Sequence, residues 1–224
     1  MPKKQSHSNR KFNWDNLPAC QILKRNENHQ DSIVVPDVFS SDECEKIIRD
    51  GSKNGFEEGR VKSKGGRKYA EESKINPSIR ETDVTWIDIS EPKFNWIYDR
   101  IVEHIEYVND NVWGYDLAEP YLIQGFQLGK YKKGSFYDWH TDFWAGVSST
   151  RRLSLTVQLT NPNEYDGGDF QIFRGDKDEY NEDPNMENQG SLILFPSHIW
   201  HKVNPITKGT RFSLVGWCLG NTLV

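Results

Sequence analysis

The stretch Tyr137-Asp138-Trp139-His140-Thr141-Asp142-Phe143 surrounds a His-x-Asp pair with aromatic side chains. Side chains on a β-strand alternate between faces, so His140 and Asp142 point the same way if this stretch is extended. On a helix the two residues would diverge by about 200°, and the aromatic neighbours favour a strand. A neutral imidazole beside a carboxylate is two thirds of a facial metal triad, and we therefore expect a second histidine ligand elsewhere in the chain.

Two histidines follow downstream, His198 and His201, and their spacing of three residues turns them to opposite sides of an extended chain. His201 begins a predicted strand, whereas His198 lies in the turn after Pro196, where a supporting or surface role is more natural. We therefore predict that His140, Asp142 and His201 are metal ligands, the set associated with non-haem Fe(II). Zinc with the same ligands stays an alternative, because ligand identity alone does not fix the metal.

Arg211 follows His201 by ten residues, across a turn that we expect to close a β-hairpin. On the second strand of that hairpin, Arg211 and Ser213 share a face with Val215 and Trp217. An arginine on the inner face of a barrel needs an anionic partner, because a buried unpaired charge is costly. Its guanidinium can hold a carboxylate through two parallel hydrogen bonds, and Ser213 can add a third. A dicarboxylate bound to the metal at one end meets this need; the alternative is an exposed Arg211 paired with a surface acid.

Beyond Pro120 the chain reads as short strands separated by turns, whereas the preceding part alternates strands with helices. A Ser40–Glu43 capping box predicts a helix after a short strand, and apolar residues at helical spacing predict a second helix that ends near 109. This pattern predicts a mainly β fold with flanking helices and a jelly-roll (cupin-like) core, an architecture that commonly houses a metal. The core strands are expected at 121–131, 136–143, 153–159, 169–173, 191–195, 200–203 and 210–219.

A chain of 224 residues is long enough for one domain with a full core. We expect a flexible arm over 1–30 and a single domain over 31–224, with helical support over 31–119 and the jelly-roll core over 120–219. The segment 55–80 is polar, rich in glycine and lysine, and longer than most connections. It is therefore a candidate lid over the site, with a plain solvated loop as the alternative.

The composition argues against several classes of protein. No apolar run approaches the roughly 20 residues of a membrane span, and the net charge of −5 gives no general attraction to nucleic acid or to acidic membranes. Three widely spaced cysteines, an odd number, argue against a disulfide framework, and they lack the close pairing of a structural zinc site. A cytoplasmic location fits these features best.

The motifs together resemble the Fe(II)/2-oxoglutarate-dependent dioxygenases, and most of all their prolyl 4-hydroxylase-like group, which includes the PKHD-type hydroxylases. The resemblance extends over about 120–219 and also includes the turn 163–170 and the segment 201–211. It implies a double-stranded β-helix fold. The residues that carry it are Tyr131 and Gly134, then His140 and Asp142, then His201, then Arg211 and Ser213.

The resemblance also implies the roles of these residues. Iron is expected on His140, Asp142 and His201, and the far carboxylate of 2-oxoglutarate on Arg211, with help from the two hydroxyl groups of Ser213 and Tyr131. Ascorbate is the implied reductant. Collagen-type prolyl hydroxylases usually carry lysine in place of this arginine, which argues against a collagen-like substrate.

The implied reaction is the hydroxylation of an unidentified substrate by O2, with release of succinate and CO2. The substrate is a peptidyl proline, another protein side chain or a small molecule, and Tyr137, Trp139, Trp144 and Arg80 are the candidates to contact it. Arg152 and the segment 55–80 are further candidates. The aromatic residues can equally belong to the core. A non-catalytic jelly-roll binding module and a cupin-like metalloenzyme that does not use 2-oxoglutarate are the alternative functions.

Overall fold

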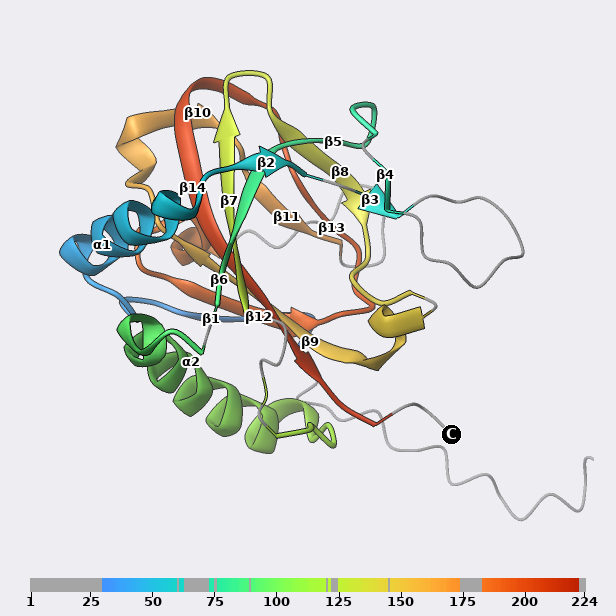
Figure 1. Ribbon diagram of the computed structural model, residues 1–224. Coiled ribbons are helices and arrows are strands. Elements are labelled where there is room, and N and C mark those ends of the chain that lie inside the picture. Colours follow the sequence, from blue (N-terminus) through green and yellow to red (C-terminus); the bar gives the residue numbers. More distant parts are fainter. Residues whose placement is uncertain are drawn as a thin grey trace, which may run out of the picture.

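The computed structural model describes residues 30–59, 61–62, 73–74, 76–88, 90–119, 121, 125–144, 146–173 and 183–221 (Figure 1). The predicted flexible arm over 1–30 lies outside the described residues except for Gln30. Much of the candidate lid over 55–80 also lies outside them. No helix in the described part of the chain has the length and apolar character needed to cross a membrane.

The described strands form two main antiparallel sheets, and a short pair that consists of β3 (Val61–Lys62) and β4 (Ser73–Lys74). The minor sheet has the order β11-β13-β8-β5, and the major sheet the order β1-β12-β9-β14-β7-β6-β2, with β10 paired to β14. The prediction of a mainly β fold with flanking helices is therefore confirmed. The strands of the minor sheet are β5 (Arg80–Glu81), β8 (Phe136–His140), β11 (Phe170–Ile172) and β13 (His201–Val203). Those of the major sheet are β1 (Ile33–Val35), β2 (Glu57–Glu58), β6 (Asp83–Ile87), β7 (Phe126–Lys132), β9 (Arg151–Gln158), β10 (Tyr165–Gly167), β12 (Leu192–Pro196) and β14 (Ile206–Leu219).

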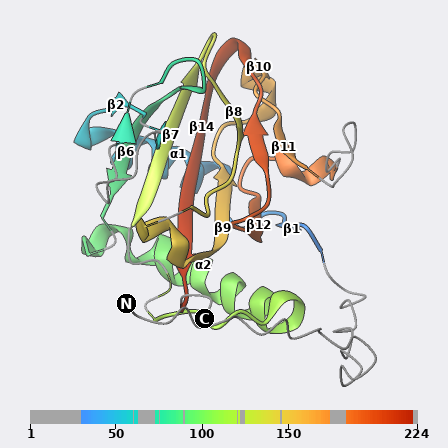
Figure 2. The same ribbon diagram turned by 90° about the vertical axis from the view of Figure 1, so that its right-hand side faces the viewer.

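The major sheet separates two hydrophobic cores. Along β12, Leu192 and Leu194 pack into the core shared with the helices, whereas Ile193 and Phe195 pack into the core between the sheets. Figure 2 shows the layers on the two sides of the major sheet, with α1 behind it and β8 and β11 in front of it. Because β12 buries both of its faces, it reads as a continuous apolar run rather than as an alternating strand.

Two α-helices cover the outer face of the major sheet, α1 (Ser41–Gly51) and α2 (Asn95–Val108). The predicted capping box begins α1, with the backbone N–H of Glu43 donating to Ser40 Oγ at 3.3 Å and that of Ser40 to Glu43 Oε2 at 2.9 Å. Glu43 also accepts from Arg100 of α2 at 2.7 Å, which ties the two helices together. The shorter helices are η2 (Ser52–Asn54), η3 (Pro92–Phe94), η4 (Asn109–Trp113), η5 (Gly146–Thr150), η6 (Pro162–Glu164) and η7 (Pro184–Glu187).

The predicted hairpin between His201 and Arg211 is wrong. β13 pairs with β8 and β11 in the minor sheet, whereas β14 pairs with β7, β9 and β10 in the major sheet. Asn204 and Pro205 carry the chain across, and their backbone bonds to Asp169 and Gly168 take the place of a hairpin ladder. The physical consequence is that His201 and Arg211 lie on opposing sheets rather than on neighbouring strands.

Gly190 lies where three segments meet, and its backbone has a φ of 86°. Its N–H donates to the carbonyl of Gln158 at 2.7 Å, and its carbonyl accepts from Phe39 at 3.2 Å. A Cβ at this position would collide with the carbonyl oxygen of Phe39. Both the left-handed backbone and the collision oppose any side chain here.

Gly190→Ala should therefore lower the free energy of unfolding by about 2 kcal/mol or more. In a domain of this size that corresponds to a fall in Tm of about 4–8 °C, measurable by thermal denaturation. Gly55→Ala is the matched control, since Gly55 has a φ of 77° but no atom within 4 Å of the added Cβ. Equal losses of stability in the two variants would contradict the steric argument.

Candidate active site

Three potential metal ligands meet where the two central strands of the minor sheet, β8 and β13, end and begin. His140 ends β8, Asp142 follows it by two residues, and His201 begins β13 directly opposite His140. Their ligand atoms all lie within 4.8 Å of one another. Nε2 of His140 is 4.0 Å from Asp142 Oδ1, and Nε2 of His201 is 3.6 Å from Asp142 Oδ2. The structure thus brings together the three residues that the sequence singled out for a metal, and the imidazole of His198 is not among them.

Both imidazoles are held in the orientation that metal binding requires. Nδ1 of His140 is 2.8 Å from the carbonyl oxygen of Asp138, and Nδ1 of His201 is 3.0 Å from that of Ile199. A carbonyl only accepts, so each Nδ1–H donates and each Nε2 keeps its lone pair for a cation. Burial and then the neighbouring His201 lower the pKa of His140 well below its usual value, which keeps this imidazole neutral and ready to ligate.

The carboxylate of Asp142 is fixed by two serines. Oγ of Ser154 donates to Asp142 Oδ2 at 2.7 Å and lies 2.9 Å from Oγ of Ser197, whose carbonyl accepts from the backbone N–H of Asp142 at 2.9 Å. Burial alone would raise the pKa of Asp142, but His201, His140, Arg151 and the Ser154 hydroxyl outweigh it and lower the pKa to about 2. The sequence did not single out Ser154 or Ser197. The one signal for Ser154 was its place on the polar face of the alternating strand β9.

Ser154→Ala should weaken Fe(II) binding about 10- to 100-fold, because groups that orient a metal ligand typically contribute that much. Fe(II) affinity can be measured under anaerobic conditions by competition with a fluorescent chelator. Ser191→Ala is the matched control, since Ser191 is also fully buried and its hydroxyl has no hydrogen-bond partner within the described residues. A similar loss of affinity in both variants would mean that Ser154 acts through packing rather than through Asp142.

Arg211 lies on the opposing sheet with its side chain almost completely buried, at 1% exposure. Nη2 donates to Gln158 Oε1 at 2.7 Å, and the guanidinium carbon is 5.4 Å from the ring centroid of Tyr131. Nη1 is buried without a hydrogen-bond partner, and no acidic side chain pairs with this cation in the described part of the chain. The alternative of an exposed Arg211 paired with a surface acid is therefore wrong. A buried guanidinium with an unused donor is a site for an anion.

One cavity of about 950 Å³ connects the two sides of the site. The three potential metal ligands line it from the minor sheet, and Arg211, Ser213 and Tyr131 line it from the major sheet. Its volume lies at the upper end of the range typical of small-molecule sites, so it exceeds what a five-carbon diacid needs. The cavity can accommodate an anion, a metal and part of a further molecule together.

Tyr137, Trp139, Trp144 and Arg80, the predicted substrate contacts, all line the same cavity. Tyr137 is in addition stacked on His140, with ring centroids 3.4 Å apart and planes at 11°. The guanidinium carbon of Arg80 lies 4.6 Å from the Tyr137 ring centroid, and Nη2 of Arg80 donates to Gln127 at 2.9 Å. Burial raises the pKa of Tyr137 to about 12, which keeps its hydroxyl protonated. Tyr137 therefore packs on a potential metal ligand as well as lining the cavity.

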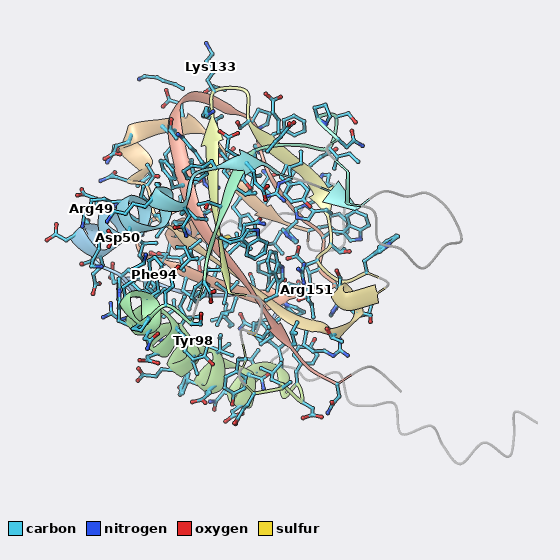
Figure 3. The ribbon with its side chains drawn as sticks, viewed as in Figure 1. Arg49, Asp50, Phe94, Tyr98, Lys133 and Arg151 are labelled. Atoms are coloured by element: carbon cyan, nitrogen blue, oxygen red, sulfur yellow. The ribbon has the colours of Figure 1, made fainter. Side chains whose placement is uncertain are left out.

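Arg152 does not line the cavity, contrary to the expectation of a substrate contact. Its guanidinium donates to the backbone carbonyls of Ser149 at 2.9 Å and of Asn221. Its neighbour Arg151, labelled in Figure 3, lines the cavity instead. The guanidinium carbon of Arg151 is 3.8 Å from the ring centroid of Trp217. The strand pairing skips Arg152, which makes it the extra residue of a β-bulge and reverses the expected alternation.

Comparison with known proteins agrees with this geometry. Residues 126–219 match the model of the 2OG-Fe(II) oxygenase superfamily. A PKHD-type hydroxylase of Idiomarina loihiensis is 26% identical over 113 residues, which are 50% of this chain and 50% of that protein. A PKHD-type hydroxylase of Gloeothece citriformis is 36% identical over 103 residues, 45% of this chain and 44% of that protein. The chain thus spans about half the length of the curated relatives it matches.

Solved structures share the fold over most of the chain. A prolyl 4-hydroxylase of Pseudomonas putida superposes with a TM-score of 0.61 at 18% identity and covers 85% of this chain and 93% of that one. A prolyl hydroxylase of Trichoplax adhaerens, in complex with a peptide fragment of hypoxia inducible factor, gives a TM-score of 0.65 at 15% identity, with 86% and 84% covered. The predicted double-stranded β-helix is confirmed by these superpositions.

Proposed function

We propose that this chain is a hydroxylase that uses Fe(II), 2-oxoglutarate and O2, as the match of residues 126–219 to the model of the 2OG-Fe(II) oxygenase superfamily supports. The observation that carries the proposal is the content of one cavity. Two oriented histidines and a carboxylate lie on one wall, and a buried arginine with an unused donor lies on the other. A diacid that ligates a metal through one end and pairs with a guanidinium through the other needs these two groups.

The donor sets fit both groups. Two neutral imidazole nitrogens and one carboxylate are a recognised set for non-haem Fe(II), and His140, Asp142 and His201 would supply them. Arg211 would pair with the far carboxylate of 2-oxoglutarate, with Ser213 and Tyr131 beside it. When bound, iron and 2-oxoglutarate would supply the oxidation, with release of succinate and CO2 and insertion of one oxygen atom into a substrate C–H bond. The chain orients that bond and excludes water from the buried wall.

The substrate that we propose is a peptidyl proline or another protein side chain. The structural neighbour from Pseudomonas putida is a prolyl 4-hydroxylase, and the one from Trichoplax adhaerens binds a peptide. Tyr137, Trp139, Trp144 and Arg80 are the proposed contacts. The 51% exposure of Trp144 at the cavity supports a role outside the core for that residue.

We also propose ascorbate as the reductant, the cytoplasm as the location and a single domain over 31–224. Strand pairing supports the single domain, and the free cysteines support the cytoplasmic location. Strands from the first half of the chain, such as β1 and β6, pair within the same sheet as β9 and β14. Cys44 and Cys218 are buried free thiols rather than parts of a disulfide.

The test is 2-oxoglutarate turnover by purified protein reconstituted with Fe(II) under anaerobic conditions. Addition of O2 should yield succinate only when both Fe(II) and 2-oxoglutarate are present, and replacement of Fe(II) by Zn(II) should stop it. Binding of metal without 2-oxoglutarate would favour the cupin-like metalloenzyme. Binding of neither would overturn the proposal in favour of a non-catalytic module.

A further inference from the structure

Three exposed tryptophan side chains line the cavity, and we call the part of the cavity that they line its mouth. Trp86, Trp144 and Trp200 are 41%, 51% and 49% exposed, and all three line the cavity. Within the described residues, Tyr107 is the one other large apolar side chain with comparable exposure. Exposed apolar side chains on a protein surface are normally scattered singly. A group of them at one opening therefore indicates an interaction site.

Carboxylates share the mouth with the indoles. Glu57, Glu58 and Asp138 are exposed, line the cavity, and make no ion pair or side-chain hydrogen bond with any described residue. Glu57 pairs with Val84 across β2 and β6, and Trp86 follows Val84 on the same face. The carboxylate of Glu57 is therefore a diagonal neighbour of the Trp86 ring.

Away from the mouth, the cavity is lined by three arginines, which we call its inner wall. Arg211, Arg80 and Arg151 line the cavity from the β14, β5 and β9 strands, and Arg80 is 7% exposed. Arg151 lies over the face of Trp217, whose ring centroid is 6.1 Å from that of Trp86. The mouth therefore attracts cations, whereas these three arginines attract anions and oppose the entry of a cationic side chain.

We propose that the mouth binds a polypeptide that carries a lysine or arginine beside the residue to be hydroxylated, an inference that rests on the proposed function. Indole faces bind the alkyl stem and the cationic head of such a side chain, and the free carboxylates complement its charge. The arginines of the inner wall keep the cation at the mouth, so the residue that enters the cavity is an uncharged neighbour. A small amine would leave the outer indoles uncovered, whereas a peptide crossing the mouth covers them.

The experiment is selection from a degenerate library of 12-residue peptides on the full chain loaded with Fe(II) and 2-oxoglutarate without O2. Lysine and arginine should be enriched about fivefold over their library frequency, as exposed cation–π and ion-pair contacts allow. The Glu57→Gln/Glu58→Gln double variant should lose this enrichment. The Glu45→Gln/Glu164→Gln double variant has the same change in net charge away from the mouth and should retain it.

No preference for basic residues, a preference for acidic ones, or no selection of any peptide would overturn the inference. Fe(II) and 2-oxoglutarate binding are measured on the same preparations and should be unchanged in both double variants. If the wild-type protein binds both but shows no basic preference, the proposed function stands and the inference about the mouth falls. If it binds neither, the proposed function falls whatever the library shows.

Discussion

Arg211→Met should weaken the binding of 2-oxoglutarate at least about 100-fold while the affinity for Fe(II) stays within about twofold. The guanidinium is 1% exposed and has an unused donor, so a bound carboxylate would receive charge-assisted hydrogen bonds in a site without competing water. Such bonds contribute about 1.5–3 kcal/mol each, and the loss of two exceeds the roughly 2.8 kcal/mol that corresponds to 100-fold. Anaerobic calorimetric titration of the Fe(II)-loaded protein measures the effect.

The stability of the unliganded protein distinguishes this role from a structural one. Methionine leaves the amide oxygen of Gln158 without its donor, but it also removes a buried cation that forms no ion pair with the described residues and interacts with Glu187 only at longer range. These effects oppose each other, and the free energy of unfolding should change by less than about 1 kcal/mol. Arg49→Met on α1, where Figure 3 shows the side chain at the surface, is the matched control and should leave 2-oxoglutarate binding intact. A large loss of stability in Arg211→Met would mean that Arg211 serves the fold.

His201→Ala should abolish both iron retention and succinate formation. The side chain contributes a prearranged lone pair to a three-residue set, so its loss should exceed the roughly 10- to 100-fold expected for Ser154→Ala. Iron content after gel filtration and 2-oxoglutarate turnover are the two measurements. His104→Ala, a half-buried histidine of α2 far along the chain from the site, should retain both. Turnover by His201→Ala at the wild-type rate would exclude His201 as a ligand.

The potential metal ligands were predictable because their signals are local. His140 and Asp142 lie two apart at the end of a strand, and His201 begins a short strand after a proline turn, so spacing alone indicated their directions. The two serines that hold Asp142 were not predictable from spacing. Ser154 and Ser197 are 12 and 55 residues from Asp142 in sequence, and they meet it because β9 and β12 pair.

The errors arose where the strand partner is not encoded locally. Strong turn residues between His201 and Arg211 predicted a hairpin, yet the 14 residues of β14 pair with β10 at their start and with β7 and β9 further along, all of them strands distant in sequence from β13. Bulges caused the other differences. The bulge in β9 turns Arg151 rather than Arg152 toward the cavity. A register shift between β8 and β13 brings Tyr137 onto the same face as His140, although the two residues are three apart in sequence.

The crossing of the chain from β13 to β14 has a mechanical consequence. The histidines lie on the minor sheet and Arg211 on the major sheet, so any molecule held by both connects the two sheets across the cavity. A bound ligand of this kind would therefore hold the two sheets together at the cavity. Local opening of β8 and β13 should then slow as 2-oxoglutarate is added, to an extent set by its concentration relative to Kd.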